Sequence, residues 1–155
     1  MHKFYLSVIF ILLAVIGFGT YKFILQGAVG NSPDNRISIK LSSSERNLLL
    51  KEMRSFLSSI QQITQALVKD DFIKAAKAAR ASGRAAQKDV PGSLMSKLPL
   101  GFKKLGFDTH SRFDQLALDT ADMEDKQLVL TQLSTLMQNC VSCHAAYRLD
   151  LEKQQ

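Results

Sequence analysis

The hydrophobic pattern of the chain begins with one long apolar segment at the N-terminus. Phe4–Tyr21 contains no charged residue and directly follows Lys3. As a helix, this segment of 18 residues would be about 27 Å long, close to the thickness of the hydrocarbon core of a bilayer. Residues 1–26 are therefore predicted to be a signal peptide or an uncleaved signal anchor. The anchor is the preferred interpretation, because Ile24 and Leu25 extend the apolar segment further.

Beyond the apolar segment, the hydrophobic positions take the spacing of amphipathic helices. Residues 27–43 combine Gly, Ser, Asn and Pro without periodicity and are predicted to be a linker. The first amphipathic helix opens with a capping box from Ser42 to Glu45. Its apolar stripe alternates steps of three and four residues, which is typical of helices that pack in a bundle. The stripe consists of Leu49, Met53, Phe56, Ile60, Ile63 and Leu67.

Caps and turn residues predict two further helices in the middle of the chain. The second helix begins at Asp70–Asp71, whose carboxylates suit a helix N-terminus, and it ends at Gly83. A turn is predicted over 99–105, where Leu-Pro interrupts the pattern. The third helix then covers about 109–121, with Asp108 as its N-terminal cap.

The fourth helix begins near Asp122 and carries the last apolar stripe of the chain. This stripe consists of Leu130, Leu133, Met137, Cys140, His144, Tyr147 and Leu151. Four helices with matched apolar stripes predict an all-α domain over 44–155 that folds as an antiparallel four-helix bundle.

The charge of the chain is uneven. There are 20 Lys and Arg against 14 Asp and Glu, a net charge of +6. Residues 69–104 hold nine Lys or Arg against three Asp, whereas residues 105–125 hold one Arg against six acids. Some of the cations have helical spacing, which fits a solvated face or a docking face for an anionic partner or lipid headgroups. These are Lys77, Arg80, Arg84 and Lys88. No aromatic residue interleaves with them, so nucleic acid is not expected as a partner.

Both cysteines of the chain lie near its C-terminus in the segment CVSCHAAYR, Cys140–Arg148. The pattern C-x-x-C-H is that of c-type haem attachment. Thiols three residues apart on a helix can form thioethers with the two vinyl groups along one edge of a porphyrin. The next residue, His144, then presents an imidazole to the iron.

Three other interpretations of this segment are weaker. A disulfide between Cys140 and Cys143 would leave His144 without a role. A thioredoxin-like dithiol belongs beside a βαβ unit, and no strand pattern surrounds this one. Structural zinc would need further ligands, and only His2 and His110 are available, without the usual ligand spacing. We therefore predict one covalent haem c held by both cysteines and His144.

The segment also resembles the C-x-x-C-H-x-x-Y-R signature of the cytochrome c prime family, through Tyr147 and Arg148. The resemblance extends over about 44–151 and implies a left-handed four-helix bundle that is exported across the membrane. It also implies an arginine, Arg148, near the proximal histidine. Helical spacing agrees, because Arg148 lies four residues beyond His144, and a surface cation is the alternative. Soluble members of the family are often homodimers through their first two helices, so the resemblance is consistent with a homodimer of this chain.

The second axial position of the iron decides between two functions. Met53 lies on the first helix, which covers the distal haem face in the family, and it is the candidate ligand; a gap-filling core residue is the alternative. His110 is a weaker candidate that could instead hydrogen-bond locally or face solvent. A methionine ligand suits electron transfer, whereas an apolar side chain leaves a five-coordinate iron that binds nitric oxide or carbon monoxide.

We predict a periplasmic c-type cytochrome that transfers single electrons between redox protein partners of a bacterial respiratory chain. It would be anchored in the cytoplasmic membrane, or secreted to the periplasm if the signal is cleaved. It is not expected to be an enzyme, because the sequence reveals no distal acid–base pair of the kind that peroxidases require. The alternative function is gas binding and detoxification by a five-coordinate haem.

Overall fold

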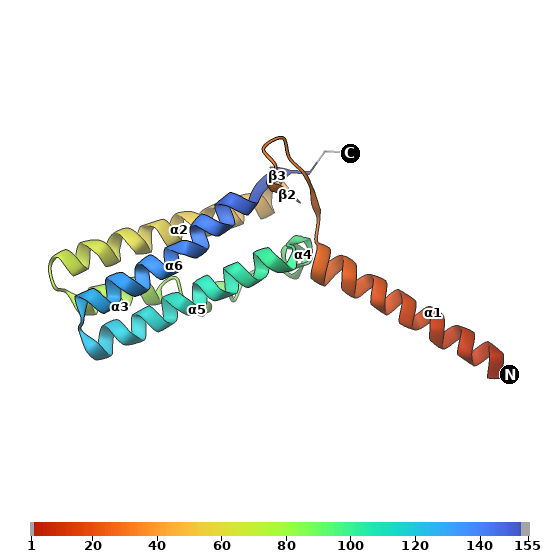
Figure 1. The fold of residues 1–155 in the computed structure, drawn as a ribbon, viewed down its shortest axis with the longest axis horizontal. Coiled ribbons are helices and arrows are strands. Elements are labelled where there is room, and N and C mark those ends of the chain that lie inside the picture. Colours follow the sequence, from red (N-terminus) through yellow and green to blue (C-terminus); the bar gives the residue numbers. More distant parts are fainter. Residues whose placement is uncertain (1, 153–155) are drawn as a thin grey trace.

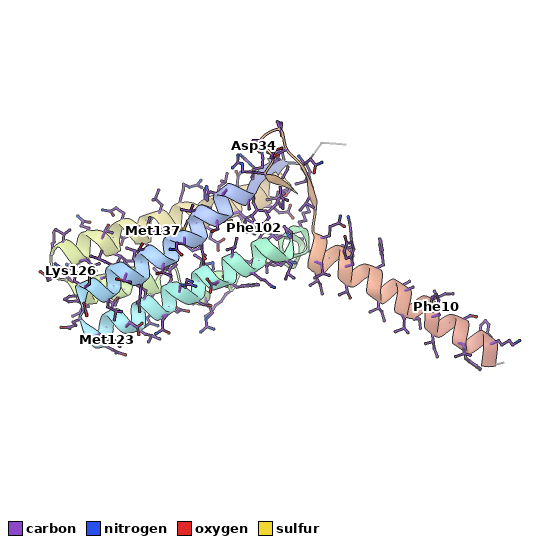
Figure 2. All side chains as sticks on the ribbon, in the orientation of Figure 1. Phe10, Asp34, Phe102, Met123, Lys126 and Met137 are labelled. Carbon is purple, nitrogen blue, oxygen red and sulfur yellow. The ribbon has the colours of Figure 1, made fainter. Side chains whose placement is uncertain are left out.

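The computed structural model describes residues 2–152, and the described chain is mostly helical, as predicted (Figure 1). Its N-terminal helix α1 (His2–Thr20) continues into a π-helical segment, η1 (Tyr21–Gln26). Side chains of this helix point outward without packing on the domain, as Figure 2 shows for Phe10, which is 74% exposed. Lys3–Gln26 has the length and composition of a helix that can cross a membrane, and a signal sequence has the same properties.

The helices of the domain lie lengthwise beside one another, and the N-terminal helix projects from one end of them (Figure 1). Two predicted N-terminal caps are confirmed. Ser42 and Glu45 form the reciprocal capping box, and the Asp71 side chain accepts a hydrogen bond from the Lys74 backbone N–H at 3.0 Å. The helical elements after residue 42 are α2 (Ser43–Val68), α3 (Phe72–Arg80), η2 (Arg84–Gln87), α4 (Gly92–Lys97), α5 (Leu100–Met123) and α6 (Lys126–Ala146).

The predicted boundaries of the last two helices were wrong. There is no turn over 99–105, because α5 begins directly after Pro99 and buries Phe102 in its first turn. Asp108 lies inside α5 and accepts hydrogen bonds from Arg112 and Asn139 instead of capping the helix. Glu124 then ends α5 in a left-handed conformation, with φ of 49°, and Asp125 caps α6.

One hydrophobic core joins α2, α3, α5 and α6. Phe56 of α2 stacks on Phe113 of α5, with ring centroids 5.5 Å apart, and Leu133 and Leu136 of α6 complete this layer. The side of α3 that enters the core consists of alanines, whose small side chains let this short helix approach α2 and α5 closely. The apolar stripe predicted for α2 therefore supplies much of the core. The stripe predicted for α6 was largely wrong, because only Leu133 of it enters the core, beside Val129 and Leu136, whereas Leu130 and Met137 are exposed.

A three-stranded sheet lies at the end of the domain that meets the N-terminal helix, and the all-α prediction missed it. Its strands are β1 (Val29–Asn31), β2 (Ile37–Leu41) and β3 (Tyr147–Leu151). β1 and β2 are antiparallel, and β3 is parallel to β2, with Ile37 opposite Tyr147. The segment 27–43 is thus not an irregular linker. Its side chains Ile39 and Leu41 are fully buried against Leu94, Leu98 and Phe102 in a second hydrophobic cluster.

Gly27 fixes the junction between η1 and the domain. Its φ is 68°, a left-handed conformation, and a Cβ at this position would collide with the Lys97 carbonyl oxygen. The next residue, Ala28, donates its backbone N–H to the same carbonyl at 2.7 Å. A glycine is therefore required here for both conformation and space.

We expect Gly27→Ala to destabilise the full-length protein by about 1–3 kcal/mol, because the side chain meets backbone atoms in a strained conformation. Thermal unfolding in detergent measures this effect. Gly92→Ala is the matched control, since Gly92 lies at an open helix start with no atom near its added Cβ. Equal melting temperatures for the two variants would show that the junction is not packed as described.

Candidate functional site

The candidate site starts on the last two turns of α6, which carry Cys140, Cys143 and His144. Asp125 caps the start of this helix by accepting the backbone N–H groups of the first turn, and the helix ends at Ala146, where the chain turns into β3. Both cysteines are free thiols, one helical turn apart and partly buried. Two thiols and an imidazole are therefore presented within five residues of one helix.

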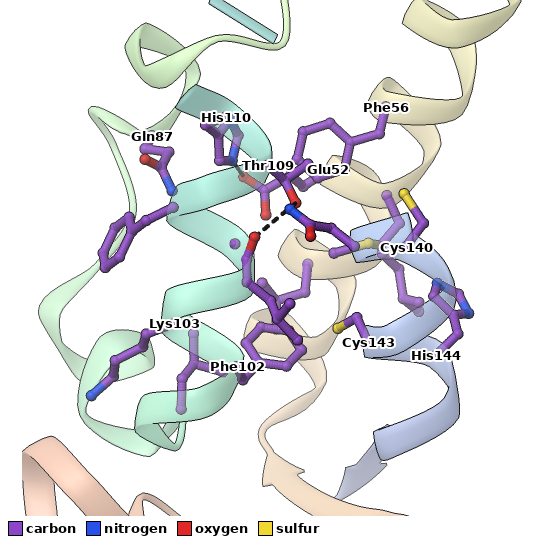
Figure 3. A pocket seen from close by; sticks show the side chains of 18 of the residues that line it. Glu52, Phe56, Gln87, Phe102, Lys103, Thr109, His110, Cys140, Cys143 and His144 are labelled. Carbon is purple, nitrogen blue, oxygen red and sulfur yellow. Dashed lines mark hydrogen bonds and ion pairs between the residues drawn. The ribbon is translucent and has the colours of Figure 1, made fainter. Parts of the chain in front are cut away.

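A cavity of about 440 Å³ lies beside these three residues. Its walls come from α2, α5 and α6, with side chains from the η2–α4 segment closing one end. Figure 3 shows the Cys143 side chain extending from α6 toward α5 across this space. The volume is within the range of natural ligand and cofactor pockets, and the walls are mainly apolar. They include Leu49, Leu50, Phe56, Leu57, Ile60 and Phe102.

Met53 of α2 lines the same cavity as Cys140, Cys143 and His144 of α6. Met53 is partly buried and packs against the main core, so its thioether lies between the core and the cavity. Residues about 90 positions apart in the sequence are thus brought to one space. Four of the five site residues predicted from the sequence are neighbours of this cavity.

Burial controls the chemistry of the two thiols. It raises the pKa of the Cys140 thiol, and burial together with the charge of Cys140 raises the pKa of the Cys143 thiol to about 11. Reactive dithiols have lowered pKa values and lie at helix N-termini, where the helix dipole favours the thiolate. These thiols lie at the C-terminal end of α6, so they lack the environment of a disulfide oxidoreductase.

His144 lies at the rim of the cavity and is exposed. Figure 3 shows its ring farther from α5 than the Cys143 side chain. Its backbone carbonyl accepts a hydrogen bond from Arg36 at 3.3 Å. Among residues 2–152, no group hydrogen-bonds to either ring nitrogen, so the imidazole is available as a ligand.

The prediction that helical spacing brings Arg148 back beside His144 was wrong. The helix ends at Ala146 because residues 147–151 pair with β2, and Arg148 therefore lies in a strand. Its guanidinium pairs with Asp150 at 2.9 Å and with Asp34 at 3.4 Å. Arg148 does not line the cavity; the cationic side chains that do are Arg54 and Lys103.

The structure also brings together Glu52 and His110, which the sequence did not connect. His110 is buried, and its Nδ1 donates to the carbonyl oxygen of Ser82 at 2.7 Å. Its Nε2 lies 3.1 Å from Oε1 of Glu52 (Figure 3). His110 therefore neither faces solvent nor bonds locally. Because acceptors occupy both ring nitrogens, it is a poor candidate for the distal iron ligand.

The Glu52–His110 pair lines the cavity, and it is the one feature of the site that sequence reasoning missed entirely. The two residues are 58 positions apart, and no local pattern links a glutamate on one helix to a histidine on another. A paired acid and base therefore exists in the cavity wall, contrary to the expectation from the sequence. Both side chains already form hydrogen bonds within the protein. Glu52 bonds to Nε2 of His110, and Nδ1 of His110 bonds to the Ser82 carbonyl.

The environment of His110 predicts a pH dependence of stability. Burial alone lowers the pKa of His110, but hydrogen bonds to Glu52 and to the Ser82 carbonyl outweigh it, and the net pKa is raised above its ordinary 6.5. The charged imidazolium thus stabilises the fold at a pH below 6.5. This contribution is lost as the pH rises through the higher pKa of the folded state.

We therefore expect the free energy of unfolding to decrease between pH 6 and pH 9 in the wild-type chain, as measured by denaturant unfolding. His110→Gln should lower stability by about 1–3 kcal/mol at pH 6, because it removes a buried charge-assisted hydrogen bond. The same variant should show a flatter pH profile than the wild type. Parallel profiles for the two proteins would contradict this assignment.

Comparison of the chain with protein-family models, curated proteins and solved structures found no match in any of the three. Within residues 2–152, no three His, Cys, Asp or Glu side chains gather as a metal-binding group. Haem iron needs only one or two protein ligands, since the porphyrin supplies the other four. The arrangement of two thiols, an imidazole and a facing thioether around an apolar cavity is compatible with such a cofactor.

Proposed function

We propose that this protein is a membrane-anchored, periplasmic c-type cytochrome that carries one covalent haem and transfers single electrons in a respiratory chain. The observation that carries the proposal is the shared cavity. It lies between the C-x-x-C-H segment of α6 and Met53 of α2, so both axial ligands predicted from the sequence border one apolar space. The volume and the apolar lining of this cavity are those of natural cofactor pockets.

The residues of the cavity fit a haem by their chemistry. Cys140 and Cys143 would hold the macrocycle through thioethers, and His144 would be the proximal ligand. Met53 would provide the thioether of the second axial position. When bound, the haem would supply a one-electron iron couple. The apolar walls would exclude water from the haem, and this would keep the reorganisation energy of electron transfer small.

The architecture supports the same proposal at the level of the fold. We interpret α2, α3, α5 and α6 as the antiparallel four-helix bundle that the resemblance to the cytochrome c prime family implies. The four helices share one core, and the connections before α3 and α6 are short. The cavity lies among α2, α5 and α6 of this arrangement.

We further propose that the N-terminal helix is retained as an anchor. Small residues that could serve a signal peptidase, Ala28 and Gly30, are part of the folded domain: Ala28 bonds to Lys97 and Lys40, and Gly30 pairs with Ser38. Cleavage there would disrupt β1 and the junction.

Haem attachment by thioethers takes place outside the cytoplasmic membrane of bacteria, so the domain would face the periplasm. Its partners would be redox proteins, and a homodimer is allowed by the resemblance.

A second candidate function rests on the composition of the cavity wall. Leu50 and Leu57 lie one turn before and after Met53 on α2 and also line the cavity. If Met53 serves only as core, these side chains would leave the iron five-coordinate and suited to nitric oxide or carbon monoxide. The protein would then bind and detoxify a gas.

The absorption spectrum of the reduced protein, with and without carbon monoxide, tests the function. Electron transfer with a Met53 ligand predicts sharp low-spin bands that carbon monoxide does not change. Gas binding predicts a high-spin spectrum that shifts when carbon monoxide is added. A colourless protein from a host that matures c-type cytochromes would refute both functions.

A further inference from the structure

The junction between the N-terminal helix and the domain carries lysines without acidic partners. Residues 1–33 and 90–107 contain no Asp or Glu at all. In the part of the chain that the structure describes, Lys22, Lys103 and Lys104 form no ion pair with a carboxylate. The remaining lysine of the second segment does, because Lys97 pairs with Glu45 and Glu152. The junction therefore has an uncompensated positive charge.

Direct contacts bring the start of α5 to the end of the apolar helix. The Lys103 amine donates to the backbone carbonyls of Phe23 and Ile24, at 3.3 and 3.2 Å. Figure 3 shows the Lys103 side chain extending from α5 toward this helix. These carbonyls lie in the last turn of η1. Backbone carbonyl groups at the end of a helix have no hydrogen-bond partner within that helix. Lys103 thus works as a cap that binds the domain to its N-terminal helix.

The apolar helix continues into the domain without an irregular linker, because Gly27 and Ala28 pack against the backbone of Lys97 and lead into β1. Two aromatic side chains, Tyr21 and Phe23, are exposed on the last turns of this helix. Exposed aromatic residues beside a lysine are typical of the membrane–water interface.

We propose that Lys22, Lys103 and Lys104 form a docking surface for the headgroups of anionic phospholipids. The inference rests on the anchor of the proposed function, since it requires that Lys3–Gln26 spans the bilayer. The headgroup layer then begins where the apolar helix ends. Lys22 lies on the last turn of this helix and Lys103 contacts it, and Lys104 is the exposed neighbour of Lys103. Phosphate oxygens are the natural partners of such lysines, each worth about fivefold in affinity for an anionic surface.

This docking has a consequence for the candidate site. Lys103 lines the cavity and also contacts the end of the apolar helix, so the cavity lies at the membrane end of the domain. The second hydrophobic cluster, against which Cys143 and Tyr147 pack, is at the same end. A cofactor in this cavity would be held close to the lipid surface, where partners that are themselves bound to the membrane can reach it.

Native mass spectrometry of the full-length protein, released from nanodiscs of phosphatidylcholine and phosphatidylglycerol in equal amounts, tests the docking. We expect the wild-type protein to retain phosphatidylglycerol preferentially. Lys103→Gln/Lys104→Gln should reduce that preference by at least fivefold. Lys104→Gln alone should also reduce it, and this exposed side chain makes no contact whose loss could unfold the protein.

The matched control is Lys77→Gln/Lys88→Gln, which removes the same charge from exposed positions of α3 and the turn after η2. It should retain the wild-type preference. The proposal is overturned if the wild type shows no preference, if the double variant keeps it, or if the control loses it equally. The same spectra show whether haem is bound and whether the N-terminal residues are retained. Absence of the cofactor or of the anchor is therefore distinguished from absence of lipid docking.

Discussion

The double variant Cys140→Ser/Cys143→Ser is expected to carry no covalent haem, although its helices should still form. Each thioether bond needs one cysteine sulfur, and the chain has no cysteine besides these two. Any haem that remains would be held without a covalent bond to the protein and should be extracted completely by acidified organic solvent. Intact mass and the colour of the solvent phase measure this loss. Each single variant should keep one thioether, so its haem should stay with the protein during extraction.

Ser142→Ala is the matched control for the cysteine variants, because Ser142 lies between the two thiols and is exposed. It should retain the full mass and colour of the wild-type protein. If the double variant stayed as resistant to extraction as the wild type, thioether attachment at these cysteines would be excluded.

Met53→Ala is expected to change the reduced protein from low-spin to high-spin and to make it bind carbon monoxide. The thioether of Met53 would be lost from the second axial position, and alanine cannot replace it as a ligand. Absorption spectra with and without carbon monoxide measure the effect. Met95 and Met137 also line the cavity, but Met137 lies on the same helix as His144 and Met95 on the short helix α4.

Leu57→Ala controls for the loss of side-chain volume at the same wall, one turn beyond Met53. It should leave the low-spin spectrum unchanged. A Met53→Ala protein with an unaltered spectrum would mean that Met53 is a core residue, and the five-coordinate alternative or another ligand would have to be considered.

Local patterns predicted those parts of the fold that local energetics determine. The Ser42 capping box and the Asp71 cap depend on hydrogen bonds within four residues, so both could be identified from spacing alone. The apolar stripe of α2 could be identified from its helical period, and its members from Met53 to Leu67 pack in the main core, whereas Leu49 joins the second cluster. The candidate site residues on α6 were predicted from a motif of nearly consecutive positions, and all three line one cavity in the structure.

The sheet could not be predicted in this way, because it joins the two ends of the chain. β3 pairs with β2 across more than 100 residues, and neither strand is long enough to show a clear period. The consequence for the site is that Arg148 leaves the helix and pairs with Asp150 and Asp34. A prediction that extended the helical spacing by four more residues therefore placed it incorrectly.

The start of α5 was missed for a different reason. Leu98-Pro99 interrupts the apolar pattern, which made the segment resemble a turn, but Pro99 stands directly before the first residue of α5, where a proline does not break the helix. Tertiary packing outweighs this preference, since Phe102 contacts Tyr147 edge to face with centroids 5.5 Å apart. The Glu52–His110 pair likewise follows from the packing of α2 on α5 and has no local signature.

The most direct test of the account is the intact mass of the full chain, purified from a bacterial host that attaches haem to c-type cytochromes. The account predicts a mass that exceeds the polypeptide by one haem, with residues 1–26 retained, and a colour that stays with the protein in acidified organic solvent. A mass equal to that of the polypeptide alone, or a pigment that leaves into the solvent, would contradict it.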